Sequence, residues 1–193
     1  MRIGLFGGTF NPPHIGHLLI AQHVGESLSL DKVLFIPAAL PPHKLGETSI
    51  APNEHRVAML LRAIQNNPLF DISTIEIDRE GVSYTIDTVR TLSETYRGAE
   101  LFVLMGSDNI AEFHTWRDPD GICALARLVV MQRGGFDLSS VDPRRRKDIV
   151  AVKTPLIEMS GTEIRERIRT GKSVRYYLTD DVAAYIDSKG LYR

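Results

Sequence analysis

The chain has 193 residues, a formal net charge of −1, 43% hydrophobic residues and 24% charged residues. These values are typical of a globular chain that can bury a core without disulfides or structural metals, and they exclude extensive disorder. The charge near zero excludes a general attraction to nucleic acid or to an anionic membrane, so anion binding would need a local site. We therefore predict neither a nucleic-acid partner nor a membrane partner.

Cysteine content and apolar runs predict a cytoplasmic protein. Cys123 is the only cysteine, so it cannot form an internal disulfide, and its apolar neighbours favour a small core residue over a reactive thiol. The N-terminal residues lack the apolar segment of a signal peptide, and no run approaches the ~18 residues of a membrane span.

Short strand-like apolar runs alternate with longer helix-like runs, a pattern typical of a parallel α/β sheet. A proline at 37 ends one such run, and Pro52 stands near the first turn of the helix that follows a loop at 39–52. In the first part of the chain we predict strands at 2–6, 32–37 and 70–79 and helices at 14–28 and 53–66.

The second part of the chain continues the alternation and ends in two helices. We predict a helix at 83–96, a strand at 99–106, one or two short helices within 107–126, strands at 127–133 and 149–153, and helices at 160–171 and 179–190. Ser160 and either Thr179 or Asp180 are expected to cap the last two helices, and Gly171 and Gly190 to end them. The predicted fold is a Rossmann-like, doubly wound parallel sheet with helices on both faces, in one domain over 1–193 whose helical part begins near 156.

The stretch "FGGTFNPPHIGHL", residues 6–18, joins the first strand to the first helix. Such a loop is where open parallel sheets bind ligands, and free N–H groups at the helix start favour an anion. Gly7 and Gly8 would allow a ligand to approach closely. The stretch matches neither the dinucleotide fingerprint nor the phosphate loop, so phosphate binding would need further groups.

Two histidines in this stretch supply such groups. His14 and His17 are three residues apart in the first helical turn, so both can project from one face, and Gly16 leaves a gap between them. Paired imidazoles beside a helix start can donate hydrogen bonds to phosphoryl oxygens and stabilise the charge of a transferring phosphorus. The alternatives are a capping histidine with a packed one, or a zinc site, which no cysteine or third histidine nearby would complete.

The residues "GGTFNPPHIGH" resemble the signature of the nucleotidyltransferase superfamily that carries the H-x-G-H motif. Its second signature is similar to "MSGTEIRERI", residues 159–168. The resemblance implies that the helix start there binds the β- and γ-phosphates of ATP. It assigns catalysis to His14, His17 and Arg165, and ATP binding to Gly7, Gly8, Thr9, Phe10, Gly16, Ser160 and Thr162. The alternative for Arg165 is an exposed helix residue paired with Glu163 or Glu166.

Three further segments resemble the bacterial nicotinate mononucleotide adenylyltransferases: "PPHK" at 41–44, "SYTIDTV" at 83–89 and "GSDNIAEFHTW" at 106–116. This family joins ATP and nicotinate mononucleotide into nicotinate adenine dinucleotide and releases pyrophosphate, with Mg²⁺ expected to arrive on ATP. By this resemblance, ATP binding also involves Gly106 and Asp108, with Asp108 holding ribose hydroxyls. Mononucleotide binding falls to Lys44, Tyr84, Thr85, Trp116 and Arg133.

Several of these residues also have an alternative interpretation as ordinary structural residues. Lys44 can be a solvated loop lysine, Asp108 a helix cap and Trp116 a core residue. The basic run from Pro143 to Lys147 can be a solvated loop, a phosphate contact or a nucleic-acid patch. No dedicated acidic cage for a metal is evident, and no sequence face predicts or excludes a homo-oligomer.

The chain departs from the family pattern at three positions. Asn11 stands where aspartate is commoner, Gly161 where a second serine is often found, and Arg117 where an aromatic residue often follows the tryptophan. The rival interpretations are an enzyme resembling phosphopantetheine adenylyltransferase and a non-catalytic nucleotide sensor on the same fold. An aminoacyl-tRNA synthetase is disfavoured, because the chain is too short for a tRNA-binding body.

Overall fold

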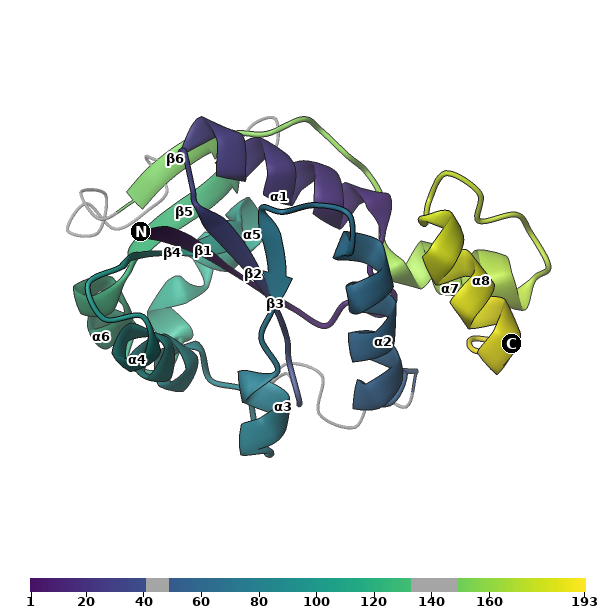
Figure 1. Ribbon diagram of the computed structural model, residues 1–193, viewed down its shortest axis with the longest axis horizontal. Helices are drawn as coiled ribbons and strands as arrows, with labels where there is room; N and C mark the ends of the chain where they lie inside the picture. The colour runs from purple at the N-terminus through teal and green to yellow at the C-terminus, as the bar shows by residue number, and fades with distance from the viewer. Residues whose placement is uncertain (41–48, 133–148) are drawn as a thin grey trace.

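The protein is seen in a computed structural model that describes residues 1–40, 49–132 and 149–193. Its centre is a parallel sheet with the strand order β3-β2-β1-β4-β5-β6 (Figure 1). From β1 the chain adds β2 and β3 on one side of the sheet and then β4, β5 and β6 on the other, as in a doubly wound Rossmann-like fold. The predicted fold class is confirmed. The strands are β1 (Arg2–Gly8), β2 (Lys32–Pro37), β3 (Phe70–Ile72), β4 (Glu100–Gly106), β5 (Arg127–Gln132) and β6 (Ile149–Lys153).

Helices cover both faces of the sheet, because successive residues of each buried strand point to opposite faces. One face packs its apolar side chains against α1 (Ile15–Ser27) and α2 (Asn53–Ile64). The other face packs against α4 (Thr85–Thr95), α5 (Ser107–Ala111), the 3₁₀ turn η2 (Phe113–Thr115) and α6 (Pro119–Leu125). Cys123 on α6 is half-buried against this second cluster, as expected of a small core residue.

The last two helices form a third apolar cluster with α2 and lie beside that helix, away from the sheet (Figure 1). They are α7 (Gly161–Arg169) and α8 (Asp180–Lys189). Their predicted ends are confirmed. The Ser160 hydroxyl accepts from the Glu163 N–H and the Thr179 hydroxyl from the Val182 N–H, while Gly171 and Gly190 take the left-handed conformation, with φ of 69° and 62°.

The strand predicted over 70–79 is wrong beyond Ile72, because residues Ile75–Arg79 form a short helix, α3. Glu76 on this helix is 8% exposed, and its carboxylate accepts a hydrogen bond of 2.7 Å from the Thr88 hydroxyl. The buried side chain is therefore a hydrogen-bonded carboxylate, which an apolar alternation cannot reveal. No helix among the described residues is long and apolar enough to cross a membrane.

Candidate functional site

The candidate site lies at the carboxyl ends of β1 and β4, where the strand order changes direction. Gly7 is near the end of β1 and Gly106 at the end of β4, and the two strands are neighbours in the sheet. A Cβ added to either glycine would meet no described atom within 4 Å. Both strand ends therefore leave open space at the point where doubly wound sheets bind their ligands.

His14 and His17 stack on each other at the start of α1. Their ring centroids are 3.6 Å apart with an angle of 22° between the planes. The His14 N–H donates to Nδ1 of His17 over 3.1 Å. Because Nδ1 accepts a hydrogen bond, a neutral His17 carries its proton on Nε2. His14 is 7% exposed, whereas His17 is half-buried, so His17 is the better placed of the pair to donate to a phosphate.

Backbone N–H groups of the first turn of α1 are less available than expected. The Ile15 N–H donates to the Tyr177 carbonyl, and the His17 N–H donates to the His14 carbonyl, each over 2.9 Å. The prediction that the helix start offers free N–H groups to an anion is therefore wrong for these two residues. Anion binding beside α1 would rest more on side chains than on the backbone.

Two other expectations about this loop are changed by its packing. A Cβ on Gly16 would lie 3.1 Å from the His14 ring and 3.2 Å from Ile157, so the gap at Gly16 is occupied by protein. A Cβ on Gly8 would lie 3.0 Å from the ring of Phe10, which is buried and has a φ of 49°. Gly8 and Gly16 thus make room for aromatic side chains, and Gly7 is the loop glycine that faces open space.

The second motif meets this loop through Arg165. Its Nη1 donates to the carbonyl oxygen of Asn11 over 2.9 Å, and its Nη2 lies 3.3 Å from the Thr162 hydroxyl and 3.4 Å from the Ser49 hydroxyl. Glu166, one of the partners expected of an ordinary surface arginine, pairs instead with Arg169 at 2.7 Å. Arg165 therefore joins the two predicted ATP-phosphate segments, which are far apart in the sequence.

The structure explains why residue 161 is glycine, where related motifs often carry serine. A Cβ there would lie 2.8 Å from the backbone oxygen of Asn11, closer than side chains pack in proteins. The first turn of α7 can therefore approach the Asn11 loop closely because residue 161 is glycine.

The predicted mononucleotide end of the site gathers beside α4. Tyr84 is the residue before α4, Thr85 is its first residue, and the Arg117 guanidinium lies 4.7 Å from the centre of the Tyr84 ring. Arg117 also lies 3.7 Å from the carboxylate of Asp87. Trp116 is half-buried, with its ring centre 5.3 Å from that of Phe113. Trp116 thus packs partly into the core, as its alternative interpretation held, while Arg117 remains largely exposed.

Asp108 is exposed in the first turn of α5, and the residue that caps this helix is Gly106, so Asp108 is not the helix cap of the alternative interpretation. Lys44, Arg133 and the basic run at 143–147 lie outside the described residues.

A buried arginine is the largest feature that the sequence analysis missed. Arg56 on α2 is fully buried, and it donates to the carbonyl oxygens of Thr9, Ala38 and Ala51 over 2.8, 2.6 and 3.2 Å and to the side chain of Asn53. Desolvation lowers the pKa of its guanidinium. The sequence does carry one signal, because Arg56 stands four residues before Leu60 and therefore lies on the same buried face of α2.

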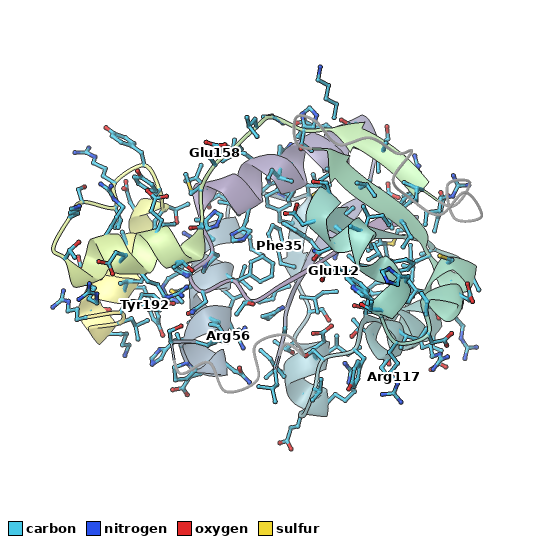
Figure 2. The ribbon with its side chains drawn as sticks, turned by 180° about the vertical axis from the view of Figure 1, so that it is seen from behind. Phe35, Arg56, Glu112, Arg117, Glu158 and Tyr192 are labelled. Atoms are coloured by element: carbon cyan, nitrogen blue, oxygen red, sulfur yellow. The ribbon has the colours of Figure 1, made fainter. Side chains whose placement is uncertain are left out.

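Figure 2 shows Arg56 and Tyr192 on the side of α2 and the C-terminal helices, Phe35 near the middle of the molecule and Arg117 at the opposite side. Within the described ranges, no group of three or more histidine, cysteine, aspartate or glutamate residues could hold a metal ion.

Comparison with known proteins identifies the family. Residues 5–167 match the model of the cytidylyltransferase-like family. A "Probable nicotinate-nucleotide adenylyltransferase" of Salinibacter ruber is 42% identical over the whole chain and 98% of its own length. A protein of the same name from Thermus thermophilus is 42% identical over the full length of both chains. This chain belongs to the nicotinate-nucleotide adenylyltransferase family. It is therefore a member of a family of nucleotidyltransferases, as the sequence motifs predicted.

Solved structures support the fold. The nicotinic acid mononucleotide adenylyltransferase of Plasmodium falciparum, complexed with NaAD, aligns over 99% of this chain and 97% of its own, with a TM-score of 0.79 and 18% sequence identity. A likeness at this identity concerns the architecture alone. It agrees with the strand order and with helices on both faces of the sheet.

Proposed function

We propose that this chain transfers the adenylyl group of ATP to nicotinate mononucleotide, giving nicotinate adenine dinucleotide and pyrophosphate in NAD biosynthesis. Membership of the adenylyltransferase family supports the reaction. The observation that carries the proposal is the contact of Arg165 with Asn11, because it unites the two ATP-phosphate segments at the carboxyl end of the sheet.

The reaction needs no protein nucleophile. A phosphate oxygen of the mononucleotide attacks the α-phosphorus of ATP and forms the new P–O bond. The bond from the α-phosphorus to the oxygen that bridges to the β-phosphorus breaks, and that oxygen leaves with pyrophosphate. The protein has to align two mutually repelling anions and stabilise the charge that develops between them.

Several protein groups fit these tasks. Nε2–H of His17, whose orientation is fixed by the hydrogen bond from His14, would donate to the α-phosphate as charge develops there. Ser160, Thr162 and Arg165 would hold the β- and γ-phosphates. The Ser160 oxygen already accepts from the Glu163 N–H, which leaves the hydroxyl hydrogen to donate to a phosphate.

The remaining ligand groups lie around the two open strand ends. Gly7, Gly8, Thr9, Phe10 and Gly16 would shape the ATP side, although Gly8 and Gly16 act by seating the rings of Phe10 and His14. Gly106 would also border ATP, and Asp108 would meet ribose hydroxyls.

The mononucleotide would lie beside α4. Trp116 would stack on the pyridine ring, and Tyr84 and Thr85 would meet its carboxylate. Lys44 and Arg133 would contact its phosphate.

Mg²⁺ is proposed to arrive with ATP, where it would neutralise phosphate charge. The described residues do not form a carboxylate cage for this ion, so we assign it no protein ligands. We also propose that the chain forms one domain and works in the cytoplasm, without nucleic-acid or membrane partners.

The proposed function is tested by incubating the protein with Mg²⁺, ATP and one acceptor at a time. The acceptors are nicotinate mononucleotide, nicotinamide mononucleotide and phosphopantetheine, and the readouts are pyrophosphate and the adenylylated product. We expect product with nicotinate mononucleotide. Product from phosphopantetheine alone would favour that sister activity, and no product from any acceptor would favour a nucleotide sensor.

A further inference from the structure

The end of the chain returns to the candidate site after α8. The Gly190 N–H donates to the Asp187 carbonyl and the Leu191 N–H to the Ile186 carbonyl, which closes the helix with a left-handed glycine. This turn reverses the chain and brings Tyr192 against Asn11, 181 positions away in the sequence. In Figure 2 the Tyr192 side chain lies between the C-terminal helices and α2.

Tyr192 contacts the side chain of Asn11, which helps to fix the loop ahead of α1. Its hydroxyl donates to Oδ1 of Asn11 over 2.8 Å, and the same oxygen accepts from the Ala51 N–H over 3.0 Å. Nδ2 of Asn11 donates to the Ser49 carbonyl over 2.9 Å, and Asn11 is 6% exposed. An amide satisfies all three partners, whereas a carboxylate would face the Ser49 oxygen without a hydrogen. This explains why asparagine stands at position 11.

The same residue holds Arg165 through its backbone. The Asn11 carbonyl accepts the hydrogen bond from Nη1 of Arg165, so the position of the Asn11 peptide sets the position of the guanidinium. Burial raises the pKa of the Tyr192 phenol, and the nearby charges of Arg165 and Arg56 oppose that rise only in part. Tyr192 therefore remains a neutral hydrogen-bond donor to Asn11 at working pH.

We propose that Tyr192 is a positioning residue that holds Arg165 in place through Asn11, so that the end of the chain supports phosphate binding. The inference rests on the proposed function, because Arg165 matters only if its guanidinium meets the phosphates of ATP. A structural role alone would stabilise the fold without any link to Arg165.

The variant Tyr192→Phe removes the hydroxyl and keeps the ring. We expect kcat/KM for ATP to fall about tenfold, since small displacements of a positioned group weaken catalysis strongly, while KM for the mononucleotide stays within about twofold. Tyr176→Phe is the matched control, because Tyr176 is 79% exposed on the connection before α8. Asn11→Asp is the second variant. We expect it to lower kcat/KM for ATP as well, because aspartate lacks the amide group that donates to the Ser49 carbonyl. An unchanged kcat/KM in Tyr192→Phe would overturn the proposal.

A double-mutant cycle distinguishes positioning from stability. If Tyr192 acts through Arg165, the variant carrying both Tyr192→Phe and Arg165→Lys should lose little more than Arg165→Lys alone. The proposal would be overturned if the fold-losses in kcat/KM of the two single variants multiply in the double variant. It would also be overturned if thermal unfolding of Tyr192→Phe accounts for its whole loss of activity. The cycle is also measured on the dissociation constant of ATP. An inactive wild-type protein that binds ATP would then refute the proposed reaction, while coupling in ATP affinity would still decide the role of Tyr192.

Discussion

Placing a methyl group on Gly161 tests how the two phosphate motifs dock. In Gly161→Ala, the new Cβ would lie 2.8 Å from the backbone oxygen of Asn11, and the next nearest atoms are the Asn11 carbonyl carbon at 3.4 Å and Nη1 of Arg165 at 3.5 Å. The obstructing atom belongs to the backbone and cannot rotate away as a flexible side chain would. The first turn of α7 or the Asn11 loop must therefore move by several tenths of an ångström.

This movement has a stability cost and a functional cost. Overpacking of this kind costs about 1–3 kcal/mol. In a protein of this size each kcal/mol lowers the melting temperature by about 2–4 °C, so we expect a fall of about 2–12 °C. The hydrogen bond from Arg165 to the Asn11 carbonyl, now 2.9 Å, would lengthen, and kcat/KM for ATP should fall about tenfold.

Thermal melts and steady-state kinetics measure both effects. Gly7→Ala is the control for the melts, because its Cβ would enter open space, and its melting temperature should stay within about 2 °C of the original. Gly161→Ser, which restores the hydroxyl common in related motifs, should be impaired like the alanine variant. A Gly161→Ala protein with unchanged melting temperature and full activity would refute the close packing of α7 on Asn11.

Three further predictions concern the remaining groups. His17→Ala should lower kcat by about 10²- to 10³-fold with a small change in mononucleotide affinity, whereas His23→Ala on the same helix should match the wild type; equal kcat values would remove His17 from catalysis. Trp116→Ala should raise KM for nicotinate mononucleotide and leave KM for ATP nearly unchanged, and equal effects on both constants in steady-state assays would place Trp116 away from the pyridine ring. Arg56→Lys keeps a charge but cannot reach three carbonyl groups, so the free energy of unfolding in urea should fall by about 2–4 kcal/mol. A fall below about 1 kcal/mol would contradict a stabilising role for the hydrogen bonds of Arg56.

The fold was predictable because its signals are local. Buried strands appear as apolar runs, and the caps and glycine stops of α7 and α8 are set by neighbouring residues. The error at 70–79 arose where the buried group is the carboxylate of Glu76, whose partner Thr88 lies on another helix. Its burial depends on a tertiary hydrogen bond and has no trace in the apolar pattern.

The candidate site was predictable to the extent that its residues lie within short motifs. His14, His17 and Arg165 were predicted as site residues in this way, and the structure joins the two segments that carry them. Arg56 and Tyr192 could not be assigned, because their partners lie on separate segments and only folding brings them together.

Under the proposed function, the docking of the C-terminal helices makes phosphate binding depend on side chains. The Tyr177 carbonyl takes the Ile15 N–H, a donor that a phosphate loop would offer to its ligand. The same C-terminal part supplies Arg165 and, through Tyr192 and Asn11, holds it beside the first motif. The docking that occupies a backbone donor of α1 thus also brings a guanidinium to the site. A guanidinium carries a full charge and several donors, so under the proposed function it would bind a triphosphate more strongly than a single backbone N–H group.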